Sequence, residues 1–153
     1  MLYLIRHAHA VDAEEDAARP LSGRGKKQVR ALAGFLSKSG AFQPEEIWHS
    51  PLVRSRETAE FLARRLKLSA PLRLVAGLEP EADPREVARR IKATPHALAI
   101  VGHEPQLSAL ASLLVMGKMD TAGFVMKKCA VLALEGAAAH WWVRWQVSPE
   151  VIV

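Results

Sequence analysis

Short apolar runs alternate along the chain with longer stretches in which apolar residues recur every three or four positions. The first run, residues 1–5, is branched and aromatic, and a short run of this kind predicts a buried strand. Residues 25–36 predict a helix, because Val29, Leu32, Phe35 and Leu36 fall at helical spacing. Gly40 is a suitable end for that helix. The chain therefore opens with a strand, an acidic loop over residues 8–19 and a helix.

The same alternation continues to the C-terminus. Residues 46–50 predict a second strand, and Pro51 is placed to open a helix that runs to about Leu66. Further strands are expected at residues 72–75 and 97–101, helices from Asp83-Pro84 and from Pro105 to near Gly117, and closing strands at 130–134 and 141–147 around a turn at Glu135-Gly136. This order predicts one α/β domain over residues 1–153. We expect a three-layer α/β/α fold, with a mostly parallel sheet flanked by helices and a closing C-terminal hairpin.

The composition is that of a globular protein with one ordinary core. The 153 residues are 50% hydrophobic and 24% charged. A single cysteine, Cys129, excludes an internal disulfide and a cysteine-based zinc site, and we expect it to be a small core residue. Arg6 interrupts the first apolar run too early for a signal peptide, and no window approaches the roughly 18 apolar residues that span a membrane. We therefore expect a cytoplasmic protein with no membrane partner.

The net charge of +5 has two interpretations. It indicates an anionic partner, such as a phosphoprotein or a nucleotide, or it reflects basic residues on helix surfaces that have no partner. Aromatic residues do not interleave with a basic run, so we do not expect nucleic-acid binding. The tryptophans of the last third are expected to anchor the closing strands: Trp141, Trp142 and Trp145.

Two arginines and two histidines stand at the ends of the predicted elements. Arg6 and His7 follow the first strand, Arg54 lies at the start of the second helix, and His103 follows the strand at 97–101. Open α/β sheets bind their ligands at the carboxyl ends of the strands. A neutral imidazole can carry a phosphoryl group covalently, and guanidinium groups hold its oxygens with bidentate hydrogen bonds. The pattern predicts a phosphate site with a histidine nucleophile and no need for a metal.

Four motifs in order carry a resemblance to a known family. They are Leu4-Ile5-Arg6-His7-Ala8, Arg19-Pro20-Leu21-Ser22-Gly23-Arg24-Gly25, Ser50-Pro51-Leu52-Val53-Arg54 with Glu57-Thr58-Ala59, and Val101-Gly102-His103-Glu104-Pro105. Together they resemble the signatures of the histidine phosphatase (phosphoglycerate mutase-like) superfamily. The short chain and the Arg-Pro-Leu-Ser segment are similar to its SixA-like phosphohistidine phosphatase branch.

The resemblance implies a role for each matching residue. His7 would be the nucleophile that becomes phosphorylated, and Arg6, Arg54 and His103 would surround the phosphate. Ser22 and Gly25 would shape the loop and the following helix, and no cofactor or metal is implied. One departure is Ala8, which stands where the family has glycine and is still small enough for the backbone to approach a phosphate.

The sequence does not identify which residue acts as the general acid. Larger family members supply a carboxylate between the second arginine and the second histidine, and the candidates in that interval are Glu79, Glu81 and Asp83. The alternative interpretation of Glu79 is a solvated loop residue. The leaving group of a phosphohistidine is an imidazole nitrogen, which takes up a proton readily. A weak or absent general acid therefore suits a phosphohistidine substrate better than an alkyl phosphate ester.

We therefore expect a metal-independent phosphatase whose substrate is a phosphohistidine on a phosphotransfer or phosphocarrier protein. One alternative keeps the chemistry on a small phosphate ester or nucleotide. Another is a module that binds phosphorylated partners without turnover. The last is a zinc-dependent hydrolase using His7 and His9, for which no third ligand is evident in the sequence.

Overall fold

A six-stranded sheet forms the centre of the computed structural model, which describes residues 1–137 and 139–152. The strands lie in the order β3-β2-β4-β1-β5-β6. Their bounds are β1 Leu2–Arg6, β2 Glu46–His49, β3 Leu72–Leu74, β4 Leu98–Gly102, β5 Val131–Ala137 and β6 His140–Val147. The first four strands are parallel to one another, and β5 and β6 pair antiparallel at one side. The predicted mostly parallel sheet with a closing hairpin is confirmed.

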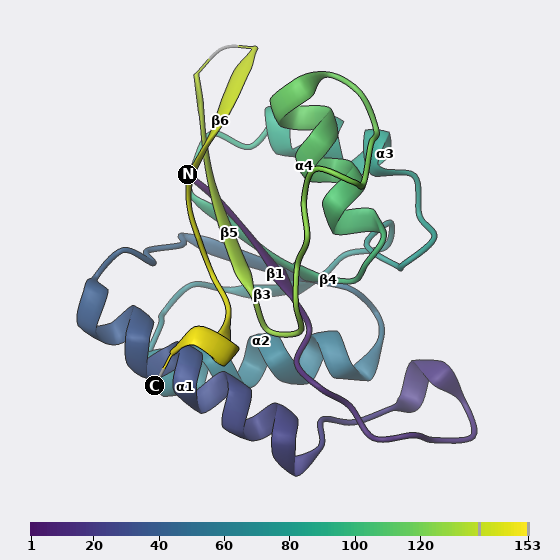
Figure 1. Cartoon of the computed structure of the whole chain (residues 1–153), viewed down its shortest axis with the longest axis vertical. Coiled ribbons are helices and arrows are strands. Elements are labelled where there is room, and N and C mark those ends of the chain that lie inside the picture. The colour runs from purple at the N-terminus through teal and green to yellow at the C-terminus, as the bar shows by residue number, and fades with distance from the viewer. Residues whose placement is uncertain (138, 153) are drawn as a thin grey trace.

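Helices cover both faces of the sheet (Figure 1). Their bounds are α1 Gly23–Ser39, α2 Val53–Leu66, α3 Pro84–Lys92 and α4 Gln106–Met116, with short 3₁₀ turns η1 Asp16–Ala18 and η2 Pro149–Val151. Side chains of β1 alternate between the faces: Leu2 and Leu4 pack in the cluster beneath α3 and α4, while Tyr3 and Ile5 pack in the cluster beneath α1 and α2. Such strands, buried on both faces, are apolar throughout, which is the pattern that the sequence showed.

The helix ends follow from capping residues. Ser22 caps α1 by accepting a hydrogen bond from the backbone N–H of Gly25, and Asp83 caps α3 by accepting from that of Arg85. Gly40 ends α1 in the left-handed conformation, with φ of 65°. The helices therefore begin and end within a few residues of the predicted positions.

The predicted turn at Glu135-Gly136 is wrong. Both residues lie inside β5, where Glu135 pairs with Trp142 and Gly136 with Trp141. A Cβ at Gly136 would lie 2.5 Å from the Trp141 ring, so this glycine makes room for the indole within the sheet and does not form a turn. Of the three tryptophans, Trp141 and Trp145 are half-buried against the core, whereas Trp142 is exposed.

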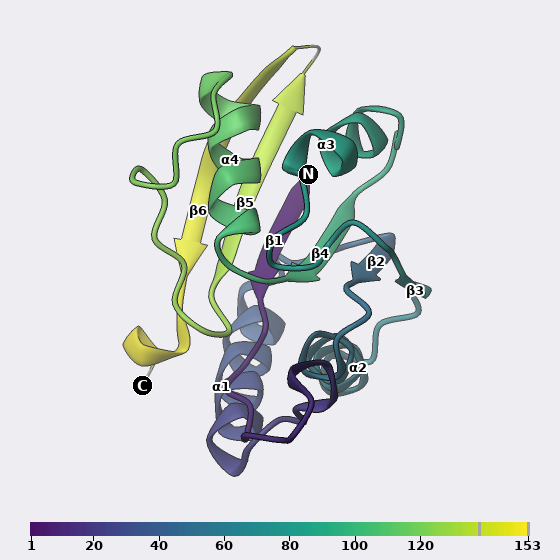
Figure 2. The same ribbon diagram turned by 90° about the vertical axis from the view of Figure 1, so that its right-hand side faces the viewer.

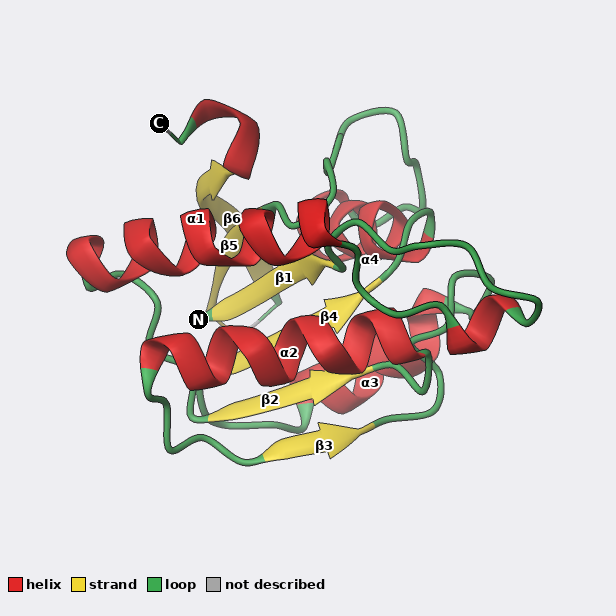
Figure 3. Ribbon diagram, turned by 90° about the horizontal axis from the view of Figure 1, so that it is seen from below, coloured by secondary structure: helices red, strands yellow, loops and turns green. Residues whose placement is uncertain are grey.

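Cys129 is fully buried, as predicted, and burial raises the pKa of its thiol to about 12. No helix among the described residues is long and apolar enough to cross a membrane. The four parallel strands end at the same edge of the sheet (Figure 3). Since the predicted site residues follow β1, β2 and β4, this edge is where they meet.

Candidate active site

His7 and His103 are brought together by the pairing of β1 with β4. Arg6 pairs with Gly102 in the parallel ladder, and the N–H of His7 donates to the carbonyl of Gly102 at 3.0 Å. Each histidine is the next residue after its strand, so the two rings lie side by side with centroids 5.0 Å apart and planes inclined by 48°. The regular register of two adjacent strands therefore fixes the distance between the histidines.

The His7 ring presents Nε2 as its basic atom. The side chain is buried, with 6% of its surface exposed. Its Nδ1 lies 2.7 Å from the carbonyl oxygen of Ala8, and because a carbonyl only accepts, Nδ1 must carry the proton. In the neutral ring the lone pair is then on Nε2. Burial lowers the His7 pKa to about 4 against the opposing Ala8 hydrogen bond, and the charges of Arg54 and Arg6 add to the lowering.

His103 is held by Ser50, which follows β2. The Ser50 hydroxyl lies 2.5 Å from Nε2 of His103, and both side chains are almost completely buried. Nδ1 of His103 is buried and has no hydrogen-bond partner within the described part of the chain. Burial first, and then the nearby His7 and Arg54, lower the pKa of His103 to about 3. Both rings are thus neutral at pH 7.

Two guanidinium groups flank the histidines. Arg54 lies in the first turn of α2 and is 5% exposed, and its Nη1 and Nη2 donate to the backbone oxygen and the carboxylate of Asp16 at 2.8 and 3.2 Å. Arg6 donates from Nη1 to the carbonyl of Met126 at 2.9 Å. The Nε atoms of both arginines are buried without a partner among the described residues. Buried unpaired donors of this kind are satisfied when an oxyanion binds between them.

Side chains of α2 fix the loop that carries His7. The hydroxyl of Thr58 accepts from the N–H of Ala8 at 3.0 Å and donates to the carbonyl of Arg54 at 2.7 Å. The carboxylate of Glu57 accepts from the N–H of Leu21 at 2.7 Å. The Glu57-Thr58 pair of the third motif therefore ties both ends of the loop to the helix that supplies Arg54.

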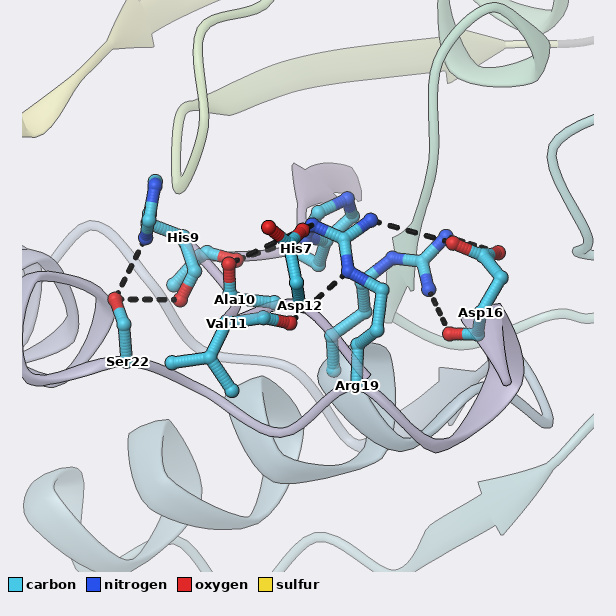
Figure 4. Close-up of polar contacts among 10 residues, drawn as sticks. His7, His9, Ala10, Val11, Asp12, Asp16, Arg19 and Ser22 are labelled. Carbon is cyan, nitrogen blue, oxygen red and sulfur yellow. Dashed lines mark hydrogen bonds and ion pairs between the residues drawn. The ribbon is translucent and has the colours of Figure 1, made fainter. Parts of the chain in front are cut away.

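Gly25 and Ser22 have the structural roles that the sequence indicated. Ser22 caps α1 and also lies 2.6 Å from Nδ1 of His9. A Cβ on Gly25 would lie 2.0 Å from the carbonyl oxygen of His9, so only glycine allows α1 to pack this closely against the loop. His9 is turned toward Ser22 and away from His7 (Figure 4). The described residues contain no group of three His, Cys, Asp or Glu side chains arranged to hold a metal ion.

Two of the three predicted acid candidates make local contacts, and the third is exposed. Glu79 accepts from the N–H of Gly77 at 2.8 Å, Asp83 caps α3, and Glu81 is exposed. Within the described residues, the carboxylate that contacts Arg54 belongs to Asp16, which sequence reasoning missed (Figure 4). Arg19 also binds Asp16, at 3.2 Å, and hydrogen bonds from Arg19 and Arg54 lower the pKa of its carboxyl group.

Sequence comparison gives a family match over residues 2–80, to the histidine phosphatase superfamily, branch 1. The chain is 33% identical over 146 residues to an uncharacterised protein of Picosynechococcus sp. strain PCC 7002, covering 91% of this chain and 87% of the relative. It is 26% identical over 153 residues to the phosphohistidine phosphatase SixA of Escherichia coli K12, covering 97% and 93%.

Solved structures share the fold over nearly the whole chain. The protein histidine phosphatase SixA complexed with tungstate matches with a TM-score of 0.88 and 24% identity, covering 97% of this chain and 96% of that one. The α-ribazole phosphatase of Shigella flexneri matches with a TM-score of 0.75 and 18% identity, covering 97% and 96%. The match over residues 2–80 and the 33% identical relative establish that this chain belongs to the histidine phosphatase superfamily, branch 1.

Proposed function

We propose that the protein is a metal-independent phosphatase that forms a phosphohistidine intermediate on His7 and acts on phosphohistidine carried by another protein. One observation carries the proposal: a neutral His7 whose Nε2 is unprotonated lies beside His103 and close to the guanidinium groups of Arg6 and Arg54. A nucleophile of this kind needs no base to activate it at neutral pH.

The reaction has two displacements. In the first, the lone pair of His7 Nε2 forms a bond to phosphorus while the phosphorus–nitrogen bond of the substrate breaks, and the leaving imidazole nitrogen takes up a proton. In the second, a water oxygen bonds to phosphorus, the bond to Nε2 breaks, and inorganic phosphate leaves with His7 restored. Arg6 and Arg54 hold the equatorial oxygens in both transition states, where charge stabilisation supplies most of the rate.

His103 acts on the phosphoryl oxygens as a hydrogen-bond donor. Its Nε2 lies against the Ser50 hydroxyl, so Nδ1 is the ring atom left to contact substrate. When Ser50 donates to Nε2, Nδ1 carries the proton and points a donor at the developing negative charge. Ser50 is then a positioning residue that selects the tautomer of His103.

The protein-borne phosphohistidine is favoured by the leaving group. The carboxylates of Glu79 and Asp83 are engaged in local contacts, and the Asp16 carboxyl group is ionised and bound to two arginines. An ionised carboxylate has no proton to give to an alkoxide, whereas an imidazole leaving group needs little help. The similarity to a phosphohistidine phosphatase at 26% identity supports the same choice.

A small phosphate ester is the second candidate substrate. Asp16 favours it, because its carboxyl group lies beside Arg54 and, once substrate binding displaces its arginine contacts, takes up a proton from solvent that it can pass to the leaving oxygen. This candidate predicts strong turnover of alkyl phosphates that depends on Asp16.

The test is the release of phosphate from a histidine-phosphorylated carrier domain, with a chelator present and with His7→Ala as the control. Fast release that resists the chelator and disappears in the variant is the expected result. Hydrolysis of small esters without release from the carrier would favour the second candidate. Turnover of neither substrate would contradict both and favour a binding module.

A further inference from the structure

A surface groove shares Arg6 with the candidate active site. It has a volume of about 670 Å³ and is bordered on one side by residues of α1. The groove is lined by Arg6, His9, Arg24, Lys27, Gln28, Ala31, Lys127, Lys128, Pro149 and Glu150. Five of these side chains are cationic and one is anionic. We propose that this basic groove binds an acidic segment of the phosphoprotein substrate next to its phosphohistidine, an inference that rests on the function proposed above.

The two walls of the basic groove come from distant parts of the sequence. Arg24 and Lys27 are one turn apart on the exposed side of α1. Lys127 and Lys128 lie opposite, on the segment that leads into β5. The 3₁₀ turn η2, yellow near the C-terminus, packs beside α1 (Figures 1 and 2). Pro149 and Glu150 of this turn also line the basic groove.

The lysine wall is tied directly to the catalytic residues. The carbonyl of Met126 accepts from Arg6 at 2.9 Å, and the N–H of Cys129 donates to the carbonyls of Arg6 and His7 at 3.0 and 3.2 Å. The two lysines lie between these anchor points. A ligand that reaches from His7 into the basic groove therefore meets cations held at a fixed place relative to the reacting phosphorus.

The cations in the basic groove repel one another. Burial lowers the pKa of Lys128, and the charges of Arg6, Arg19, Arg24 and Arg54 lower it further. Among the ion pairs of the described residues, none involves Arg24, Lys27, Lys127 or Lys128. A surface with this much uncompensated positive charge attracts anions and speeds their encounter with the site.

An acidic protein segment fits the lining better than a nucleic acid. Nucleic acids on such surfaces stack their bases on aromatic side chains, and the lining contains none apart from the His9 ring. Arg24 and Lys27 are spaced by one helical turn, which matches carboxylates three or four residues apart on a partner helix. A single bound phosphate would fill only a small part of a groove of about 670 Å³.

The test compares two triple variants that remove the same amount of charge. Arg24→Gln/Lys27→Gln/Lys127→Gln removes cations of the basic groove and leaves Arg6, His9 and Lys128 in place. Lys38→Gln/Arg65→Gln/Lys118→Gln, at exposed positions outside it, is the control. The substrates are a phosphotransfer domain with carboxylates beside its phosphohistidine, the same domain with those carboxylates replaced by amides, and free phosphohistidine.

We expect the groove variant to lose about tenfold or more in kcat/KM on the acidic domain, because three attractive charges are removed. Its kcat/KM on free phosphohistidine stays unchanged, and the control variant behaves as wild type on all substrates. Wild-type enzyme acting on the amide-bearing domain shows the same loss, and raising the salt concentration narrows the difference between wild type and variant. An equal loss on free phosphohistidine, or no loss on the acidic domain, would overturn the proposal.

Direct binding separates this proposal from the proposed function. A fluorescent glutamate-rich helical peptide is titrated with wild type and both variants, beside a single-stranded oligonucleotide of equal charge. Binding of the peptide that is lost only in the groove variant supports the basic groove even if no phosphohistidine substrate is turned over. Peptide binding that is absent or equal in all three proteins overturns it, and so does preferential binding of the oligonucleotide.

Discussion

Replacement of Gly25 by alanine tests how closely α1 must pack against the loop that carries His7. The added Cβ would lie 2.0 Å from the carbonyl oxygen of His9, whereas such contacts are normally at least 3.0 Å, so the loop and the helix must separate by about 1 Å. That carbonyl accepts from the N–H of Ser22 at 3.0 Å, and the N–H of His9 donates to Gln28 at 2.8 Å. Loss of two hydrogen bonds at about 1 kcal/mol each, with strain added and the helix preference of alanine subtracted, gives about 2 kcal/mol of destabilisation.

The same displacement reaches His7, two residues before His9. A shift of about 1 Å in a reacting group costs about 100-fold in rate, so we expect kcat/KM to fall by about that factor while the fold is retained. Gly23→Ala is the matched control, because a Cβ there has no atom within 4 Å and the residue also lies in the first turn of α1. We expect its stability to be unchanged or raised by up to about 1 kcal/mol.

Urea unfolding of the three proteins measures the free energies, and phosphate release from a phosphohistidine substrate measures the rates. The two alanine variants should differ by about 2 to 3 kcal/mol in the free energy of unfolding. If Gly25→Ala were as stable and as active as Gly23→Ala, the close approach of α1 to the His9 carbonyl would have no role in positioning His7.

Three further predictions concern the charged and buried groups of the site. Because burial lowers the pKa of His7 from 6.5 to about 4, only the unfolded chain takes up the His7 proton between these values. His7 therefore contributes about 3 kcal/mol to the free energy of unfolding that is lost between pH 7 and pH 4, beside the loss from His103, whose pKa is lowered in the same direction. Urea unfolding should show a loss about 3 kcal/mol smaller in His7→Gln than in wild type, whereas equal losses would contradict the shift. Asp16→Asn should change the free energy of unfolding by less than about 1 kcal/mol, because the carboxylate is mostly exposed. It should also tighten the inhibition of turnover by inorganic phosphate, because Arg54 loses its ion pair with Asp16 and is free to bind the phosphate. Weaker inhibition in phosphate titrations would refute the competition between Asp16 and phosphate for Arg54. Ser50→Ala leaves His103 without its buried hydrogen-bond partner, so it should lower the free energy of unfolding by about 1 to 3 kcal/mol and shift the pH profile of kcat. An unaltered pH profile would show that Ser50 does not set the tautomer of His103.

Much of the fold follows from local patterns in the sequence. The apolar runs of β1 and β4 and the caps at Ser22 and Asp83 are written in neighbouring residues, so periodicity and capping rules find them. The hairpin turn was misplaced because Gly136 has the composition of a turn but serves the packing of an indole from the partner strand. That contact depends on strand register, which the local sequence does not specify.

The site divides in the same way. Arg6, His7, Arg54 and His103 stand at element ends, and the rule that ligands bind at the carboxyl edge of a parallel sheet is enough to group them. The hydrogen-bond partners of these residues could not be grouped by the same rule, because they are brought into contact by the paths of the loops. Asp16 reaches Arg54 across 38 positions of sequence, and Ser50 reaches His103 across 53. The sequence places Ser50 in a recognisable motif but does not indicate its role. Nothing in the acidic loop distinguishes Asp16 from its neighbours.

The most direct test of the account is to trap the phosphorylated enzyme. Wild-type protein and His7→Ala are mixed with a histidine-phosphorylated substrate, quenched in alkali, where phosphohistidine survives, and digested for mass spectrometry. We expect a phosphoryl group on His7 that appears and decays at rates matching turnover, and none in the variant. Turnover without any phosphorylated enzyme, or a phosphoryl group on His103 in its place, would contradict the assignment of His7 as the nucleophile.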